Sequence, residues 1–248
     1  MSDAMTMLRR NVRHTTRNPS ALIMTIGIPV VLLLLFVGVF GDSLSAGRDG
    51  DYIDYLVAGV LLMTVGYGAT TTALAVNRDM TAGIIDRFRT MAISRTSVLT
   101  GHVVGSTART LVSAVLVVAV AFALGFRPHG DALGWLGAAG LLALLTIALT
   151  WLGVAVGLAA PTPEATAPFT LIIQLLPFLS SAFVPPESMS GAVRWFAGHE
   201  PFTPITDSLR GLMLDTPIGR EGPAAVVWCL ILAAAGYAWA RTLFSRDR

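Results

Sequence analysis

Residues 135–160 read WLGAAGLLALLTIALTWLGVAVGLAA, a stretch without a single Asp, Glu, Lys, Arg or His. An α-helix rises about 1.5 Å per residue, so roughly 20 apolar residues cross the hydrocarbon of a bilayer. This run exceeds that length. It is therefore predicted to form a membrane-spanning helix.

Five further apolar runs lie on either side of the first, at 21–40, 53–76, 103–126, 165–184 and 224–243. Hydrophobic residues make up 54% of the 248-residue chain and charged residues only 13%, with a mean hydropathy of +0.70. Such a chain has too little polar surface to cover a water-soluble globule. We predict an all-α membrane protein whose single transmembrane domain contains six transmembrane helices.

The basic residues set the orientation of these helices. All seventeen are Arg; twelve fall on the side that holds both termini and five on the other. Because cytoplasmic loops are enriched in basic residues, both termini are expected in the cytoplasm. The Arg residues are scattered between the apolar runs, which favours membrane lipid rather than nucleic acid as their anionic partner.

The absence of Lys also limits the chemistry of the chain. A phosphate loop of the form G-x-x-x-x-G-K-[ST] requires Lys, so this chain cannot hydrolyse ATP as a P-loop enzyme does. Any ATP chemistry must come from a partner.

Two segments outside the apolar runs have amphipathic spacing on the predicted cytoplasmic side. Residues 1–20 alternate apolar and basic positions at helical spacing, as in an interfacial helix. In the segment 78–97, Met80, Ile84, Phe88 and Met91 recur one helical turn apart. This second pattern fits a helix that docks a soluble partner, and it also fits a loop whose apolar side rests on lipid.

The predicted outer loop, 185–223, contains two further helical patterns, at 189–197 and 203–214. They suggest re-entrant helices that dip into the outer leaflet, with an ordinary surface loop as the alternative.

Few polar side chains interrupt the apolar runs. Gln174 needs a partner, which could be another helix or a substrate, and together with Thr170 and Phe178 it marks a possible substrate path. Arg109, near the inner end of its run, is expected to reach lipid phosphate. Gly153 and Gly157 form a G-x-x-x-G pattern that indicates packing within the chain.

Catalytic and metal sites are not indicated. The four His residues are far apart, and His199-Glu200 lacks the second His of a zinc helix. No catalytic residue, metal or cofactor is therefore expected on this chain. Three functions fit such a membrane protein. The first is a transporter driven by ATP hydrolysis on a partner, and the second is an ion-coupled secondary transporter, which needs ionisable groups near the bilayer centre. The third is a membrane enzyme or assembly factor.

Several segments together resemble a known family. They are YLVAG at 55–59, the stretch from Asp79 through GIIDRFR at 83–89 to ISR at 93–95, RNP at 17–19, and FTPITDSLRG at 202–211. They are similar to the type-2 ABC export permeases, and most of all to the daunorubicin-resistance membrane subunits of actinobacteria. The likeness covers nearly the whole chain.

The resemblance implies an efflux permease of the plasma membrane, of the kind that confers antibiotic resistance. Such a subunit pairs with a second permease copy, identical or sister, and with two ABC ATPase subunits that bind ATP and Mg²⁺. Its substrate would be amphipathic, lipid-like or drug-like. The implied ATPase-coupling residues are Gly83, Ile84, Asp86, Arg87, Phe88, Arg89, Met91 and Arg95. An implied outer lid contains Phe183, Trp195, Leu209 and Arg210.

Overall fold

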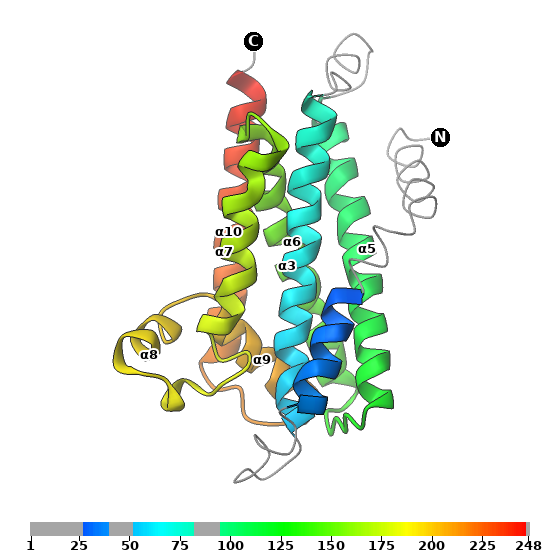
Figure 1. Ribbon diagram of the computed structural model, residues 1–248, viewed down its shortest axis with the longest axis vertical. Coiled ribbons are helices and arrows are strands. Elements are labelled where there is room, and N and C mark those ends of the chain that lie inside the picture. The colour runs from blue at the N-terminus through cyan, green and yellow to red at the C-terminus, as the bar shows by residue number, and fades with distance from the viewer. Residues whose placement is uncertain (1–26, 40–51, 82–94, 247–248) are drawn as a thin grey trace.

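The computed structural model describes residues 27–39, 52–81 and 95–246, and these ranges contain helices and turns but no strand. Four long helices run side by side: α3 (Tyr52–Thr81), α5 (Arg95–Ala123), α6 (Ala132–Ala159) and α10 (Glu221–Arg246) (Figure 1). In the described ranges, these four are long and apolar enough to cross a membrane, and a shorter apolar helix covers Gly27–Val39. The all-helical prediction is confirmed for this part of the chain. The predicted helix at 1–20 lies outside it.

The helices around the segment 78–97 extend further than the hydropathy pattern suggests. Helix α3 continues from its apolar run to Thr81, and α5 already begins at Arg95, whereas the apolar run starts at 103. Hydropathy marks where a helix leaves the hydrocarbon, not where its backbone stops being helical. Both ends of the segment therefore belong to long helices, while 82–94 lies outside the described residues.

The fifth apolar run forms a rod with two changes of helix type. A 3₁₀ turn at Pro163–Thr166 leads into α7 (Ala167–Leu175), and a second 3₁₀ turn follows at Leu176–Leu179. Pro177 lacks the N–H that would continue the α-helical hydrogen bonds. The rod therefore ends five residues before the predicted limit at 184.

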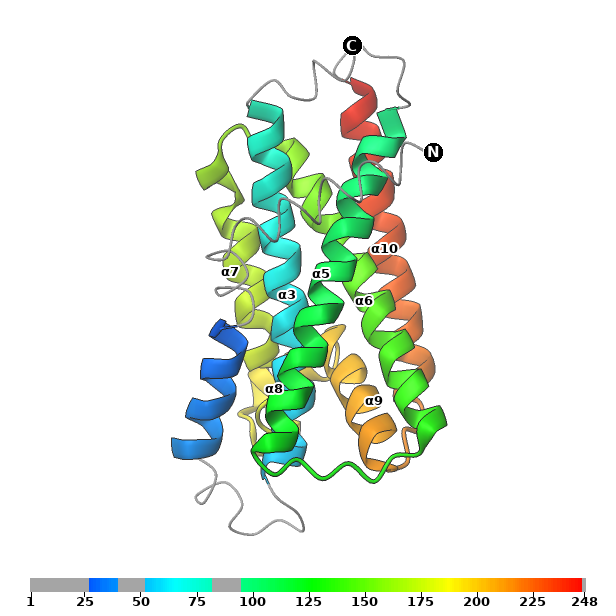
Figure 2. The ribbon, with the colours of Figure 1, turned by 90° about the vertical axis from the view of Figure 1, so that its right-hand side faces the viewer.

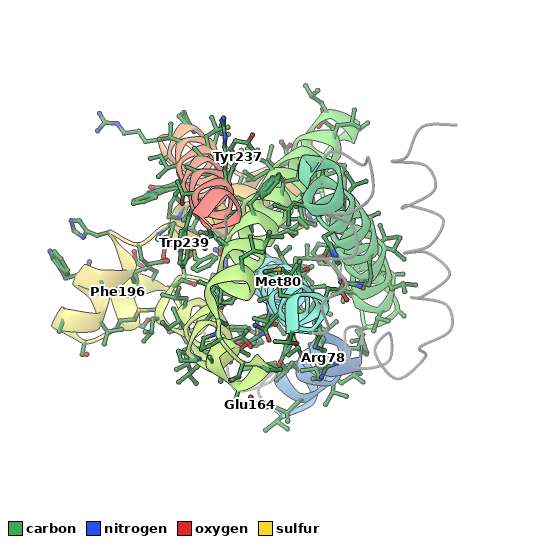
Figure 3. All side chains as sticks on the ribbon, turned by 90° about the horizontal axis from the view of Figure 1, so that it is seen from above. Arg78, Met80, Glu164, Phe196, Tyr237 and Trp239 are labelled. Atoms are coloured by element: carbon green, nitrogen blue, oxygen red, sulfur yellow. The ribbon has the colours of Figure 1, made fainter. Side chains whose placement is uncertain are left out.

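Helix α3 forms the centre of the bundle. Seen along the bundle in Figure 3, it is surrounded by α5, α6, α7 and the Gly27–Val39 helix, while α10 packs on α6. The contact of α6 with α3 is backbone to backbone. A Cβ on Gly153 would lie 2.5 Å from the carbonyl oxygen of Ala69, and one on Gly157 would lie 2.5 Å from that of Ala73. The G-x-x-x-G pattern thus packs within the chain, as predicted.

The segment 185–223, the predicted outer loop, contains a 3₁₀ turn at Pro186–Ser188, α8 (Gly191–Ala197) and α9 (Phe202–Leu214). Helix α9 lies at the end of the bundle where α3 begins, whereas α10 ends at the opposite end, near Thr81 and Arg95 (Figures 1 and 2). The outer loop and the flanks of the segment 78–97 are therefore separated by the length of the bundle.

Candidate functional site

Helix α9 is built into the end of the bundle rather than lying on its surface. It packs against α3, α6 and α10 (Figure 2). Ile205, Leu209 and Met213, which share one face of α9, are 0–1% exposed, so this apolar face is buried. Leu209, expected in an outer lid, is thus a core residue of that element. The Gly130 N–H donates to the Met213 carbonyl at 2.9 Å, which ties the loop before α6 to α9.

Arg210 joins α9 to two other parts of the chain. Its Nη1 contacts Oδ1 of Asp207 at 2.6 Å, its Nη2 donates to the Ser181 carbonyl at 2.9 Å, and its Nε donates to the Tyr55 carbonyl at 3.3 Å. The guanidinium carbon also lies 3.6 Å from the centre of the Tyr55 ring, a cation–π geometry. Only 14% of the Arg210 side chain is exposed, against 33% for Asp207. Arg210 is therefore a buried cross-link between α3, the turn after Leu179, and α9.

Ser181 is the point at which this polar network converges. Its carbonyl accepts from the Tyr55 hydroxyl at 2.6 Å as well as from Arg210. Its own hydroxyl donates to Asp207 Oδ1 at 2.7 Å, and its N–H donates to the Thr203 hydroxyl at 3.1 Å. We call Tyr55, Ser181, Asp207 and Arg210 the outer polar cluster. It joins α3, the turn after Leu179, and α9 by polar contacts beside the apolar face that α9 buries.

The start of α9 is capped by Glu200. Its two carboxylate oxygens accept from the N–H of Phe202 at 2.7 Å and of Thr203 at 2.5 Å, satisfying donors that the first turn of a helix leaves free. Glu200 is 5% exposed. Burial raises its pKa to about 7, although the two N–H bonds favour the ionised form. A carboxyl group that titrates near neutral pH therefore holds the N-terminal end of α9.

The other residues expected in the lid differ from each other in burial. Phe183 is 4% exposed and stacks between Phe36 and Phe178, with ring centres 5.0 and 4.8 Å away. Its carbonyl accepts from the Tyr52 hydroxyl at 3.4 Å. Trp195 on α8, by contrast, is 65% exposed and stacks on His199. Phe183 and Arg210 therefore lie in one closed end, and Trp195 lies outside it.

The residues expected along a substrate path lie on the rod that contains α7. Both amide atoms of Gln174 are buried and have no hydrogen-bond partner. The Thr170 hydroxyl donates to the Thr166 carbonyl of its own helix at 3.4 Å. Phe178 is 43% exposed at the end of the rod. Of the three, only Gln174 has polar atoms that are free to receive a ligand.

The coupling residues from Gly83 to Met91 fall outside the described residues, and Arg95 is the first residue of α5. The helices that flank them are joined by a contact of His102 Nε2 with Asp79 Oδ2 at 3.1 Å. Two residues before Asp79, the Asn77 amide donates to the carbonyls of Gly157 and Ala160 at 3.2 and 2.7 Å. The base of the segment is thus connected to α5 and to the end of α6.

Metal ligation has no candidate in this part of the molecule. Across 27–39, 52–81 and 95–246, no three His, Cys, Asp or Glu side chains are placed to hold a metal ion.

Sequence reasoning found Arg210 but not its partners. Tyr55 is 155 positions away from it and Ser181 is 29, and no local pattern connects them. The spacing of Asp207 and Arg210, one turn apart on a predicted helix, was the available signal. Glu200 was considered only as part of a zinc motif, although an acidic residue just before a helix is also a capping signal.

Comparisons with known proteins agree on one family. Residues 3–214 match the model of the ABC-2 type transporter family. A daunorubicin resistance ABC transporter permease of Streptomyces coeruleorubidus is 29% identical, over 87% of this chain and 76% of its own length. A probable doxorubicin resistance ABC transporter permease of Mycobacterium tuberculosis is 24% identical, over 96% and 90% of the two chains. A putative transport permease of Pyropia yezoensis is 27% identical, over 73% of this chain and 65% of its own.

Proposed function

Because this chain belongs to the ABC-2 type transporter family, we propose that it is the permease subunit of an exporter that moves an amphipathic, lipid-like or drug-like molecule out of the cytoplasm. The observation that carries the proposal is the family match over residues 3–214, since this range includes the predicted coupling segment 78–97. Without Lys the chain has no P-loop, so ATP and Mg²⁺ are bound by a separate ATPase.

The complex contains two permease copies, identical or sister, and two ATPase subunits, in the plasma membrane with both permease termini in the cytoplasm. The Arg asymmetry of the sequence supports this orientation. Six spans require that the chain around the Gly27–Val39 helix and the rod at 163–179 also cross the bilayer. Seventeen helical residues extend about 25 Å, close to the thickness of the hydrocarbon.

ATP-driven closure of the ATPase pair acts on the coupling segment. Ile84, Phe88 and Met91 enter a groove on the ATPase. The residues Asp86, Arg87 and Arg89 make polar contacts at its rim, and Gly83 and Arg95 belong to the same interface. The Asp79–His102 contact and the two Asn77 hydrogen bonds support this route, because the first joins the two flanks of the segment and the second joins the α3 flank to the end of α6.

The outer polar cluster is the gate through which substrate leaves. Arg210 and Phe183 hold the end of the bundle closed, and α9 moves when their contacts separate. The polar contacts of Arg210 support the role, because hydrogen bonds to water replace them at small net cost on opening. The free amide of Gln174 contacts the substrate as it passes.

The decisive experiment co-expresses the chain with an ABC ATPase encoded beside it and measures co-purification and vanadate-sensitive ATP hydrolysis. The test variant is Phe88→Asp, which puts a charge on the apolar stripe of the coupling segment. Its matched control is Thr90→Asp, which puts the same charge on the opposite side of the predicted helix.

We expect Phe88→Asp to lose the ATPase while its amount in the membrane is unchanged, and Thr90→Asp to retain it. Transport that persists without ATPase, and that stops when the proton or sodium gradient is collapsed, would instead identify a secondary transporter. Equal behaviour of the two variants would refute the predicted coupling stripe.

A further inference from the structure

Arg109 is the one described residue whose charge lies deep in a candidate span without a counter-charge. It stands midway along α5, as many residues from Arg95 as from Ala123. The His102–Asp79 contact marks the polar edge of α5, and Arg109 lies seven residues further in, about 10 Å along the helix. The sequence predicts Arg109 near the inner end of its apolar run, 103–126, and its distance from His102 is consistent with that position.

The Arg109 guanidinium is the first donor in a chain of hydrogen bonds in which each group donates to the next. Nη2 of Arg109 donates to the Ser106 hydroxyl at 3.2 Å, and Ser106 bonds to the Thr72 hydroxyl of α3. Thr72 donates its own proton to the Gly68 carbonyl at 2.7 Å, so Ser106 must be the donor to Thr72. Ser106 therefore accepts from Arg109 while donating its proton to Thr72, and as a neutral hydroxyl it supplies no counter-charge.

The Nε donor of Arg109 lacks an acceptor. A guanidinium carries several N–H groups and accepts no hydrogen bond. The Nε of Arg109 is buried and has no hydrogen-bond partner. The network thus holds the guanidinium in place by one nitrogen and leaves its Nε donor unsatisfied.

No described element packed against α5 supplies the missing negative charge. The Gly27–Val39 helix and α6 contain neither Asp nor Glu. On α3, Asp54 lies at the far end, where it accepts from the Arg127 N–H, and Asp79 is paired with His102. An isolated charge at this depth is costly, and such residues in spans commonly mark a binding site.

We infer that Arg109, held by Ser106, binds the oxyanion of an amphipathic molecule, a phosphate or carboxylate on an apolar tail. A planar guanidinium matches two oxygens of either group. The neighbouring outward positions of α5 are apolar and suit a tail: Val112 is 59% exposed, Val115 68% and Leu116 42%. The site takes either a phospholipid of the bilayer or the transported molecule, and only the latter assignment rests on the proposed function.

The test measures binding of dodecyl phosphate to the full chain in phosphatidylcholine nanodiscs. Three variants are compared with the parent protein: Arg109→Gln, Arg109→Lys and Arg220→Gln. Arg109→Lys keeps the charge, and Arg220→Gln makes the same change in net charge at an exposed position far from α5.

We expect Arg109→Gln to raise the dissociation constant of dodecyl phosphate about tenfold or more. Arg109→Lys, which keeps the charge but not the planar pair of donors, should bind more weakly than the parent and more tightly than Arg109→Gln, and Arg220→Gln should keep the full affinity. Unchanged binding by Arg109→Gln, or the same loss in Arg220→Gln, overturns the inference. Inorganic phosphate should bind no variant measurably, since it has no tail.

Adding phosphatidylglycerol to the nanodiscs separates the two sources. If this lipid displaces dodecyl phosphate, the site belongs to bilayer phospholipid; if it does not, the site belongs to the transported molecule. ATPase recruitment is measured on the same samples. The anion site is supported if Arg109→Gln loses dodecyl phosphate binding but still recruits the ATPase normally. If binding depends on Arg109 in a chain that recruits no ATPase, the anion site stands and the proposed exporter function fails.

Discussion

Replacing Arg210 by Met should loosen the end of the bundle that α9 closes. The variant loses hydrogen bonds from a charged donor to the carbonyls of Ser181 and Tyr55, each contributing about 1.5 kcal/mol or more. The ion pair with Asp207 adds about 1 kcal/mol or less, because that carboxylate is one-third exposed. These terms overlap, so the free energy of unfolding should fall by about 3 kcal/mol. For a chain of this size that corresponds to a drop of about 9 °C in Tm.

Cys229 provides the assay for this variant. It is the only cysteine in the chain and is 0% exposed, so a maleimide dye reacts with it only as the bundle opens. Heating the detergent-purified protein with the dye gives Tm directly. Arg220→Met, at an exposed position, is the control and should leave Tm within about 1 °C of the parent value.

A double-mutant cycle with Asp207→Asn tests whether the contacts act together. The two substitutions should couple by about 0.5 kcal/mol or more, because the side chains touch. A Tm of Arg210→Met equal to that of Arg220→Met would show that the outer polar cluster does not hold α9.

Three further predictions follow from the same geometry. Gly157→Val should destabilise the fold by about 3 kcal/mol, because a Cβ at this position would lie 2.5 Å from the Ala73 carbonyl oxygen. The control is Gly140→Val, where a Cβ would have no atom within 4 Å, and it should change the dye-reported Tm little. Glu200 has a pKa of about 7 in the folded chain, above its ordinary 4.5, so its stabilising contribution is complete below pH 4.5 and is lost as pH rises through 7. That loss amounts to about 3 kcal/mol, and a Tm series against pH should flatten in Glu200→Gln. Gln174→Leu should raise the free energy of unfolding by about 1 kcal/mol, because it removes buried polar atoms that have no partner. The same variant should slow the export of a fluorescent amphipathic molecule from reconstituted vesicles. An unchanged export rate would show that Gln174 is not part of the substrate path.

The membrane makes part of this fold predictable from sequence. Helix α6 was expected at 135–160 and is found at Ala132–Ala159, because a polar backbone in lipid must satisfy its own hydrogen bonds. The packing of Gly153 and Gly157 was predictable for the same kind of reason: close approach of helices in lipid requires small residues.

The features that sequence reasoning missed depend on contacts between distant residues. The partners of Arg210 lie on α3 and in the turn after Leu179, and periodicity carries no information about such pairs. The coupling residues from Gly83 to Met91 lie outside the described ranges, so their placement stays a prediction.

The glycine contact between α3 and α6 bears on how the chain is made. Seventy-eight residues separate Thr81 from Ala159, and a ribosome adds about 5–20 residues per second, so α3 waits roughly 4–16 seconds for the helix that fits it. During that time the Ala69–Ala73 face of α3 meets lipid or the insertion machinery instead of α6. Because of this helix order, α3 can pack against its glycine partner only after α6 has been synthesised. Slow codons before α6 should therefore lengthen the interval in which the unpaired α3 is exposed to proteases.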